Sequence, residues 1–419
     1  MPATETHRAI EAVWKMESAR VIAGLTRIVR DVGVAEELAQ DALVTALEKW
    51  PDSGIPGNPG AWLMATAKHR AIDYLRRGTL IGQKHEDLGR EMAQREMQVP
   101  DLAAAMDDNI GDDMLRLVFI ACHPVLSTEA RVALTLRLLG GLTTEEIARA
   151  YLTSEPTIAQ RIVRAKRTLT ESQVPFEVPR GGEFNARLTS VLQVLYLIFN
   201  EGYSATSGDD WMRPALCDEA MRLGRILVGL VPDQAEAHGL VALMEIQASR
   251  SKARVNAAGE PVLLLDQNRA KWDRLLIGRG LAALERAEAL GGSRQSYTIQ
   301  AAIAACHARA VTASGTDWSR IAALYRELGQ IEPSPIVELN RAVAVSMASG
   351  PAAGLEVVEE LKDDPALKNY HLLPSVRGDL LKRLGRLNEA RAEFERAASM
   401  TRNVREKNLL LERARSCTG

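Results

Sequence analysis

Residues 142–169, LTTEEIARAYLTSEPTIAQRIVRAKRTL, carry two helix-start signals that decide the local fold. Thr143 is a predicted N-cap, and Glu146 three residues later completes a capping box for a first helix. Ser154 begins a second helix, whose first turn accommodates Pro156 because the missing N–H would have no partner there. Two helices joined by a short connection predict a helix-turn-helix.

Apolar residues recur at helical spacing in both of these helices. The predicted buried side of the first helix consists of Ile147, Ala148, Tyr151 and Leu152, and that of the second of Ile158, Ile162, Ala165 and Leu169. The outward side of the second helix offers Thr157, Gln160, Arg161 and Arg164, which can reach base edges or phosphates in a DNA major groove. The alternative is a pair of surface helices in an all-α bundle with a solvated basic face.

A second cationic helix is predicted at residues 58–77, NPGAWLMATAKHRAIDYLRR. Asn58 is a good N-cap, Pro59 occupies the first helical position, and the helix ends in cations that suit its negative C-terminal dipole. Before it, residues 35–50, AEELAQDALVTALEKW, form an amphipathic helix with Leu43, Leu47 and Trp50 on one face. Its acidic edge is formed by Glu36, Glu37, Gln40 and Asp41. Such an edge is a poor DNA ligand but a good protein contact.

The order of acidic helix, cationic helix with a tryptophan, spacer and helix-turn-helix resembles the extracytoplasmic-function group of bacterial RNA polymerase sigma factors. The resemblance covers about the first 170 residues. The family's region 2 signature is matched by Glu36, Glu37, Leu38, Gln40, Asp41, Trp62, Leu63, Ala67, Ile72, Asp73, Leu75, Arg76 and Arg77. Its region 4 signature is matched by Glu146, Ile147, Ala148, Ser154, Thr157, Ile158, Arg161, Arg164, Ala165 and Leu169. His69 departs from the pattern, since the family usually has asparagine there.

This resemblance implies two partners, core RNA polymerase and promoter DNA. Contacts with the polymerase, through the clamp helices and flap of its large subunits, are expected from Glu36, Glu37, Gln40 and Asp41. Contacts with the minus-10 element are expected from Trp62, Lys68, His69, Arg70, Arg76 and Arg77. Contacts with the minus-35 element are expected from Ser154, Thr157, Gln160, Arg161, Arg164 and Lys166.

The composition limits what else the chain does. With 419 residues it is long enough for two to four domains, and a formal net charge of −2 leaves only local cationic clusters for nucleic acid. Its four cysteines form no CxxC pair, which argues against a disulfide framework or a zinc site. No phosphate loop, HExxH or GxSxG motif is present. The sequence therefore predicts a cytoplasmic, non-membrane protein that is not an enzyme and uses no cofactor or metal.

The helical patterns along the chain predict an all-α fold with several domains. The predicted domains are residues 8–78 (region 2), 112–172 (region 4) and 184–419 (C-terminal extension), joined by linkers at 79–111 and 173–183. Gly315, Gly350 and Gly385 recur at an interval close to the tetratricopeptide period, each at a predicted turn between two helices. The last repeat is the best match, with Gly378, Leu381, Ala390, Phe394 and Ala397 as its packing residues.

Two further segments of the extension hold aromatic and charged residues, FNEGY at 199–203 and KWDR at 271–274. They either line a groove for a peptide or small molecule or contain buried rings with a satisfied carboxylate nearby.

The chain as a whole looks like the sigma factors that carry a C-terminal tetratricopeptide-type domain, in which the extension replaces a separate regulatory protein. The leading hypothesis is a sigma factor whose extension modulates its activity and binds a regulatory protein or peptide. The first alternative is a free-standing helix-turn-helix regulator, which needs neither the acidic helix nor the Trp62 helix. The second is a tetratricopeptide scaffold with a purely structural helix-turn-helix, which leaves the two cationic motifs without explanation.

Overall fold

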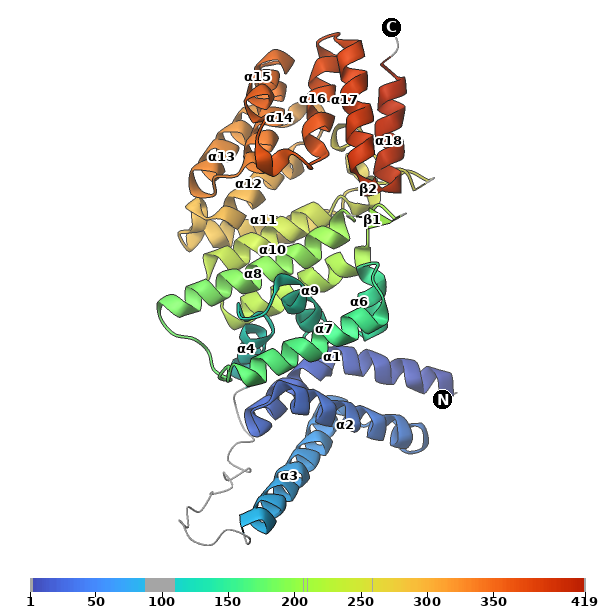
Figure 1. Cartoon of the computed structure of the whole chain (residues 1–419), viewed down its shortest axis with the longest axis vertical. Helices are drawn as coiled ribbons and strands as arrows, with labels where there is room; N and C mark the ends of the chain where they lie inside the picture. Colours follow the sequence, from blue (N-terminus) through green and yellow to red (C-terminus); the bar gives the residue numbers. More distant parts are fainter. Residues whose placement is uncertain (1–2, 87–109, 206, 209, 258, 418–419) are drawn as a thin grey trace. The chain divides into compact units, whose positions relative to one another are not determined.

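The chain is helical through most of the residues that the structure describes, which confirms the predicted all-α fold (Figure 1). A computed structural model describes residues 3–86, 110–205, 207–208, 210–257 and 259–417. The first helices are α1 (Ala3–Val29), α2 (Val32–Ser53), α3 (Pro59–Glu86), α4 (Ile110–Ala121), α5 (Thr128–Leu138), α6 (Thr144–Ala150), α7 (Glu155–Glu171) and α8 (Gly182–Tyr203). The later ones are α9 (Pro214–Leu230), α10 (Ala235–Ala248), α11 (Arg274–Ala289), α12 (Ser296–Arg309), α13 (Trp318–Ile331), α14 (Pro335–Ser349), α15 (Pro351–Leu361), α16 (Leu372–Arg383), α17 (Leu387–Met400) and α18 (Val404–Arg415).

The chain divides into two compact units, Met1–Val194 and Leu195–Gly419. The boundary falls inside helix α8, whereas the sequence suggested a start of the extension at residue 184. The predicted linker at 79–111 begins inside helix α3, which continues to Glu86, so its first part is helical. Residues 87–109 of that linker lie outside the described residues. The second predicted linker, 173–183, overlaps the gap between α7 and α8, and its last two residues belong to α8.

The first unit is built on α1, which packs against α2, α3 and α4. Its apolar side is almost completely removed from solvent, with Ile10, Ile22 and Leu25 at 2% exposed or less. Trp50 of α2 and Leu63 of α3 are each 1% exposed and belong to the same core. Helices α5 and α6 both pack on α7, so the helix-turn-helix shares this unit with the three N-terminal helices.

The second unit stacks consecutive helices against one another, as Figure 1 shows from α10 to α18. Gly315, Gly350 and Gly385 lie at the turns between α12 and α13, α14 and α15, and α16 and α17, which confirms the predicted positions. Gly350 and Gly385 have φ angles of 99° and 78°. Glycine suits both positions because a residue with a Cβ rarely adopts this backbone conformation.

Helices α16 and α17, which form the last predicted repeat, pack as the repeat pattern predicted. Phe394 of α17 is completely buried, and a Cβ built on Gly378 of α16 would lie 3.0 Å from its ring. The two ends of the unit also meet in a short parallel pair, β1 (Ser207–Gly208) with β2 (Arg402–Asn403). There the Asn403 side-chain amide donates to the backbone carbonyls of Ala205 and Asp210, at 3.1 and 2.9 Å.

Candidate nucleic-acid and polymerase interface

The helix-turn-helix formed by α6 and α7 begins at the predicted caps. The backbone N–H of Thr143 donates to Glu146 Oε2 at 2.8 Å, and the N–H of Glu146 donates to Thr143 Oγ1 at 3.1 Å. Ser154 caps α7, with Pro156 in its first turn. These contacts confirm the capping box and the second helix start.

The buried sides of the two helices agree with the sequence except at Tyr151, which is half-buried, and at Leu152. Ile147 and Ala148 of α6 are buried, as are Ile158, Ile162, Ala165 and Leu169 of α7. Leu152, predicted to be buried, is 55% exposed. Helix α6 ends at Ala150, and Leu152 follows with a φ of 48°, so the helical spacing no longer applies to it.

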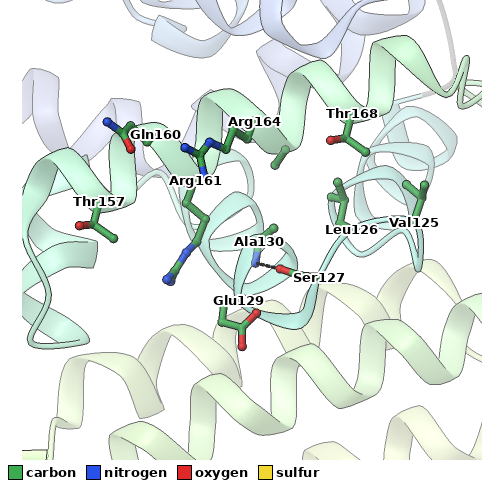
Figure 2. Close-up of a pocket in the computed structure, with 11 residues that line it drawn as sticks. Val125, Leu126, Ser127, Glu129, Ala130, Thr157, Gln160, Arg161, Arg164 and Thr168 are labelled. Carbon is green, nitrogen blue, oxygen red and sulfur yellow. Dashed lines mark hydrogen bonds between the residues drawn. The ribbon is translucent and has the colours of Figure 1, made fainter.

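The outward face of α7 presents the polar residues expected to read DNA. Thr157, Gln160 and Arg164 are exposed and Arg161 is half-buried. With the start of α5 they line a pocket of about 440 Å³, shown in Figure 2. In that view the Arg161 side chain extends toward the start of α5, where Glu129 lies.

Glu129 stays ionised beside this face. Its pKa is lowered mainly by a hydrogen bond from its own backbone N–H and by the Ser127 hydroxyl, with the charge of Arg161 adding to the effect. The Glu129 carboxylate therefore offsets part of the positive charge of Arg161. Arg164, exposed on the same helix, is the more accessible cation for DNA phosphate.

The acidic edge of α2 differs from the prediction at Glu36. Glu37 and Asp41 are exposed, but Glu36 is only 4% exposed. Its carboxylate accepts from Arg137 Nε of α5 at 2.6 Å and forms an ion pair with the Lys166 ammonium of α7. The expectation of an exposed Glu36 is therefore wrong in this arrangement, because two cations far along the chain enclose it.

Lys166 is thus placed differently from the other residues expected to contact the minus-35 element. Its side chain is 21% exposed and pairs with α2, whereas Ser154 and Thr157 are exposed and share a hydrogen bond between their hydroxyls at 2.7 Å. Gln40 is half-buried and donates to Glu36 Oε1 at 2.8 Å. Glu36, Gln40 and Lys166 thus form one polar cluster at the contact between α2 and α7.

Two more contacts hold the same surfaces together. The hydroxyl of Thr170 on α7 donates to Asp31 Oδ2, just before α2, at 2.9 Å. Lys15 of α1 pairs with Glu146 of α6 at 3.2 Å. The helix-turn-helix is therefore joined to α1 and to the start of α2 by polar contacts.

Helix α3 starts as predicted, because the backbone N–H of Ala61 donates to Asn58 Oδ1 at 3.0 Å. Trp62 is half-buried, and its ring meets that of Trp50 edge to face with centroids 5.2 Å apart. This tryptophan therefore has a packing role within the first unit. Its contact with Trp50 also fixes the start of α3 against α2.

The cations of α3 divide into paired and exposed residues. Arg70 donates to Thr45 Oγ1 at 2.8 Å and pairs with Asp41 of α2 at 3.3 Å. Lys68 is half-buried, whereas His69, Arg76 and Arg77 are exposed. Of the residues expected at the minus-10 element, these last three are the ones that this arrangement leaves open to solvent.

Helix α8 contributes to the first unit, which the sequence pattern did not indicate. Arg187 donates to the backbone carbonyl of Phe119 at 3.1 Å, and the Ser190 hydroxyl donates to that of Cys122 at 2.7 Å. Phe184 meets Phe119 edge to face, with ring centroids 5.4 Å apart. The first half of α8 thus completes the core around α4, a role that a helix after a proline-rich boundary did not suggest.

Cys122 and His123 occupy structural positions. Burial raises the pKa of the Cys122 thiol to about 11 and lowers the pKa of His123 to about 4. Cys122 is 1% exposed and belongs to the core. Among the described residues, no group of histidine, cysteine and acidic side chains is arranged to hold a metal ion. In the same part of the chain, no helix is both long and apolar enough to cross a membrane.

Comparison with known proteins assigns the first unit. Residues 14–80 match sigma-70 region 2, residues 116–169 match sigma-70 region 4, and residues 187–288 match a family of unknown function (DUF6596). An uncharacterized protein of Rhizobium meliloti (strain 1021) is 42% identical over 92% of this chain and 90% of its own length.

Several sigma factors match less than half of the chain. The ECF RNA polymerase sigma factor SigK of Mycobacterium sp. (strain KMS) is 28% identical over 37% of this chain and 77% of its own length. The probable ECF RNA polymerase sigma factor SigI of Mycobacterium tuberculosis (strain ATCC 25618 / H37Rv) is 26% identical over 41% of this chain and 58% of its own. The chain belongs to the extracytoplasmic-function group of sigma-70 factors and carries an additional helical region at its C-terminus.

Proposed function

We propose that this chain binds core RNA polymerase through the exposed acidic residues of α2 and directs it to promoters that α3 and α7 recognise. The exposed pair Glu37 and Asp41 carries the first part of the proposal. The two residues lie one helical turn apart, so they present one negative surface to a basic partner. A free-standing DNA-binding regulator has no use for such a surface.

The cationic face of α7 supports the second part. Arg164 and Gln160 are exposed beside Thr157, and their side chains suit phosphate and base-edge contacts. With a formal net charge of −2, the chain relies on local cations of this kind to bind DNA. Titration of core RNA polymerase with the full-length chain tests the proposal. Formation of a stoichiometric complex is the expected result, and the absence of a complex at micromolar concentrations contradicts it.

The C-terminal region is proposed to modulate this activity. Helix α8 runs from the first unit into the second, so the region is held at high effective concentration near the DNA-binding helices. A chain that ends at Tyr203 keeps the contacts of Phe184, Arg187 and Ser190 with the first unit.

We expect this shortened chain to support less promoter-specific transcription than the full-length protein, by about fivefold or more, the lower end of couplings between sites. Quantified transcripts from one promoter give the comparison. Increased transcription would indicate an inhibitory region, and equal transcription from both chains would exclude a modulating role.

A further inference from the structure

The second unit contains a cluster of arginines and aromatic rings that the sigma-70 regions do not explain. This arginine–aromatic cluster consists of Tyr203, Trp211, Arg250, Arg254, Arg269 and Trp272. All six residues lie within the match to the family of unknown function. The FNEGY and KWDR segments supply Tyr203 and Trp272, whereas the three arginines lie outside both segments.

The guanidinium groups of the cluster lie close to its aromatic rings. Arg254 Cζ lies 3.5 Å from the centroid of the Tyr203 ring, and Arg269 Cζ lies 4.7 Å from that of Trp272. Arg250 Cζ lies 5.8 Å from the centroid of the Tyr203 ring and 5.9 Å from that of the Trp272 ring, so Arg250 is near both of these rings. The three arginines are only 7–9% exposed, so like charges are concentrated where water screens them poorly.

The positive charges of two of these arginines are stabilised by carbonyl groups at helix C-termini. Arg254 donates to the backbone carbonyl of Tyr203, the last residue of α8. Arg269 donates to the carbonyls of His307 and Ala310 at the end of α12, and to Thr316 Oγ1 at 3.1 Å. Such carbonyls carry the negative end of the helix dipole, which stabilises a cation.

Arg250 has no such partner within the described part of the chain. Its side chain makes no hydrogen bond or ion pair there, and its Nε is buried without an acceptor. The carboxylates on the two nearby segments are already used. Glu201 pairs with Arg213, and Asp273 accepts from the backbone N–H groups of Leu275 and Leu276 at the start of α11. A buried cation without a counter-charge costs free energy unless an anion approaches it.

Other donors in the cluster also lack acceptors. Trp272 Nε1 and Arg269 Nε are buried donors without a hydrogen-bond partner. His307, whose backbone carbonyl accepts from Arg269, also has an unpartnered ring nitrogen, Nδ1, which is a donor in one tautomer and an acceptor in the other. Burial, together with the charges of Arg250 and Arg269, lowers the pKa of His307 to about 4, so its ring is neutral at pH 7. Unsatisfied donors at one place point to a missing acceptor rather than to a missing cation.

We propose that the arginine–aromatic cluster is a binding site for the oxyanion of a small-molecule ligand, a carboxylate or a phosphate, held chiefly by Arg250. The planar guanidinium offers two parallel N–H groups that match either oxyanion, and burial strengthens the resulting charge-assisted hydrogen bonds. The proposal concerns the C-terminal unit alone and does not depend on DNA or polymerase binding.

Thermal unfolding of the full-length protein tests this site at pH 7 and constant ionic strength, with sodium chloride exchanged for phosphate or for acetate. We expect at least one of the two anions to raise the Tm of the wild-type protein by about 5 °C at concentrations well above its Kd. A rise with phosphate alone identifies a phosphate site, and a rise with acetate alone identifies a carboxylate site.

Three variants separate binding from general salt effects. Arg250→Met removes the charge and is expected to lose the anion response while keeping or raising the Tm in chloride. Arg250→Lys keeps the charge without the planar fork and is expected to weaken the response. Arg294→Gln, at an exposed arginine of the same unit, is expected to respond like the wild type. No rise with either anion, an equal rise in Arg250→Met, or a strongly lowered Tm of that variant in chloride would overturn the proposal.

Discussion

The double substitution Glu37→Lys/Asp41→Lys is expected to weaken binding to core RNA polymerase by about a thousandfold, since opposed like charges at an interface cost several kcal/mol. Both side chains are exposed on α2, so their reversal leaves the core of the first unit untouched. The intramolecular contact that is lost is the Asp41–Arg70 ion pair, which is also exposed. Pairs of this kind contribute about 0–1 kcal/mol to stability.

The matched control is Glu48→Lys/Asp52→Lys. It reverses two exposed carboxylates with the same spacing on the same helix, but nearer its C-terminal end. We expect the control to bind core enzyme like the wild type in a competition titration. Undiminished binding of the Glu37/Asp41 variant, with an unchanged circular dichroism spectrum, would show that α2 does not contact the polymerase.

Replacing Arg161 and Arg164 by alanine is expected to lower the affinity of the polymerase complex for its promoter by about a hundredfold, because each good contact to a base or phosphate contributes about 1–3 kcal/mol. Arg164 is exposed, whereas Arg161 extends toward Glu129, so we expect Arg164→Ala to have the larger single effect. Promoter binding measured at several salt concentrations separates the two kinds of contact. Loss of a phosphate contact reduces the salt slope by about 0.9, and loss of a base contact relaxes the preference at one position.

Arg8→Ala/Arg20→Ala removes the same charge from exposed positions of α1 and serves as the control. It is expected to leave promoter affinity and salt slope close to those of the wild type. Equal losses in the two double variants would mean that total charge, and not the face of α7, determines the affinity.

Local signals in the sequence were sufficient wherever a few neighbouring residues decide the structure. The capping residues Thr143 and Ser154 mark the starts of α6 and α7, and Gly350 and Gly385 occupy turns that require a left-handed backbone. Each of these depends on hydrogen bonds or dihedral angles within one turn of chain. The exception, Leu152, lies just past a helix end, where small errors in the boundary invert the burial of a side chain.

Contacts between distant segments could not be read from the pattern. Glu36 belongs to a helix with an acidic edge, yet it is buried because Arg137 and Lys166 lie more than a hundred residues away in the chain and close to it in space. The lack of an ion-pair partner for Arg250 could not be predicted either, because it depends on which nearby carboxylates are paired with other residues in the fold. Helical periodicity predicts on which face of a helix a residue lies, but it does not predict the charge of the side chains that pack against that face.

Transcription with purified components tests the central claim most directly. Core RNA polymerase, the full-length chain and fragments of genomic DNA are incubated together, and the 5′ ends of the RNA products are sequenced. We expect transcripts that begin at defined positions downstream of a shared two-part sequence motif. These transcripts should be absent with core enzyme alone and with the Glu37→Lys/Asp41→Lys variant. RNA products indistinguishable from those of core enzyme alone would contradict the assignment of this chain as a promoter-specific sigma factor.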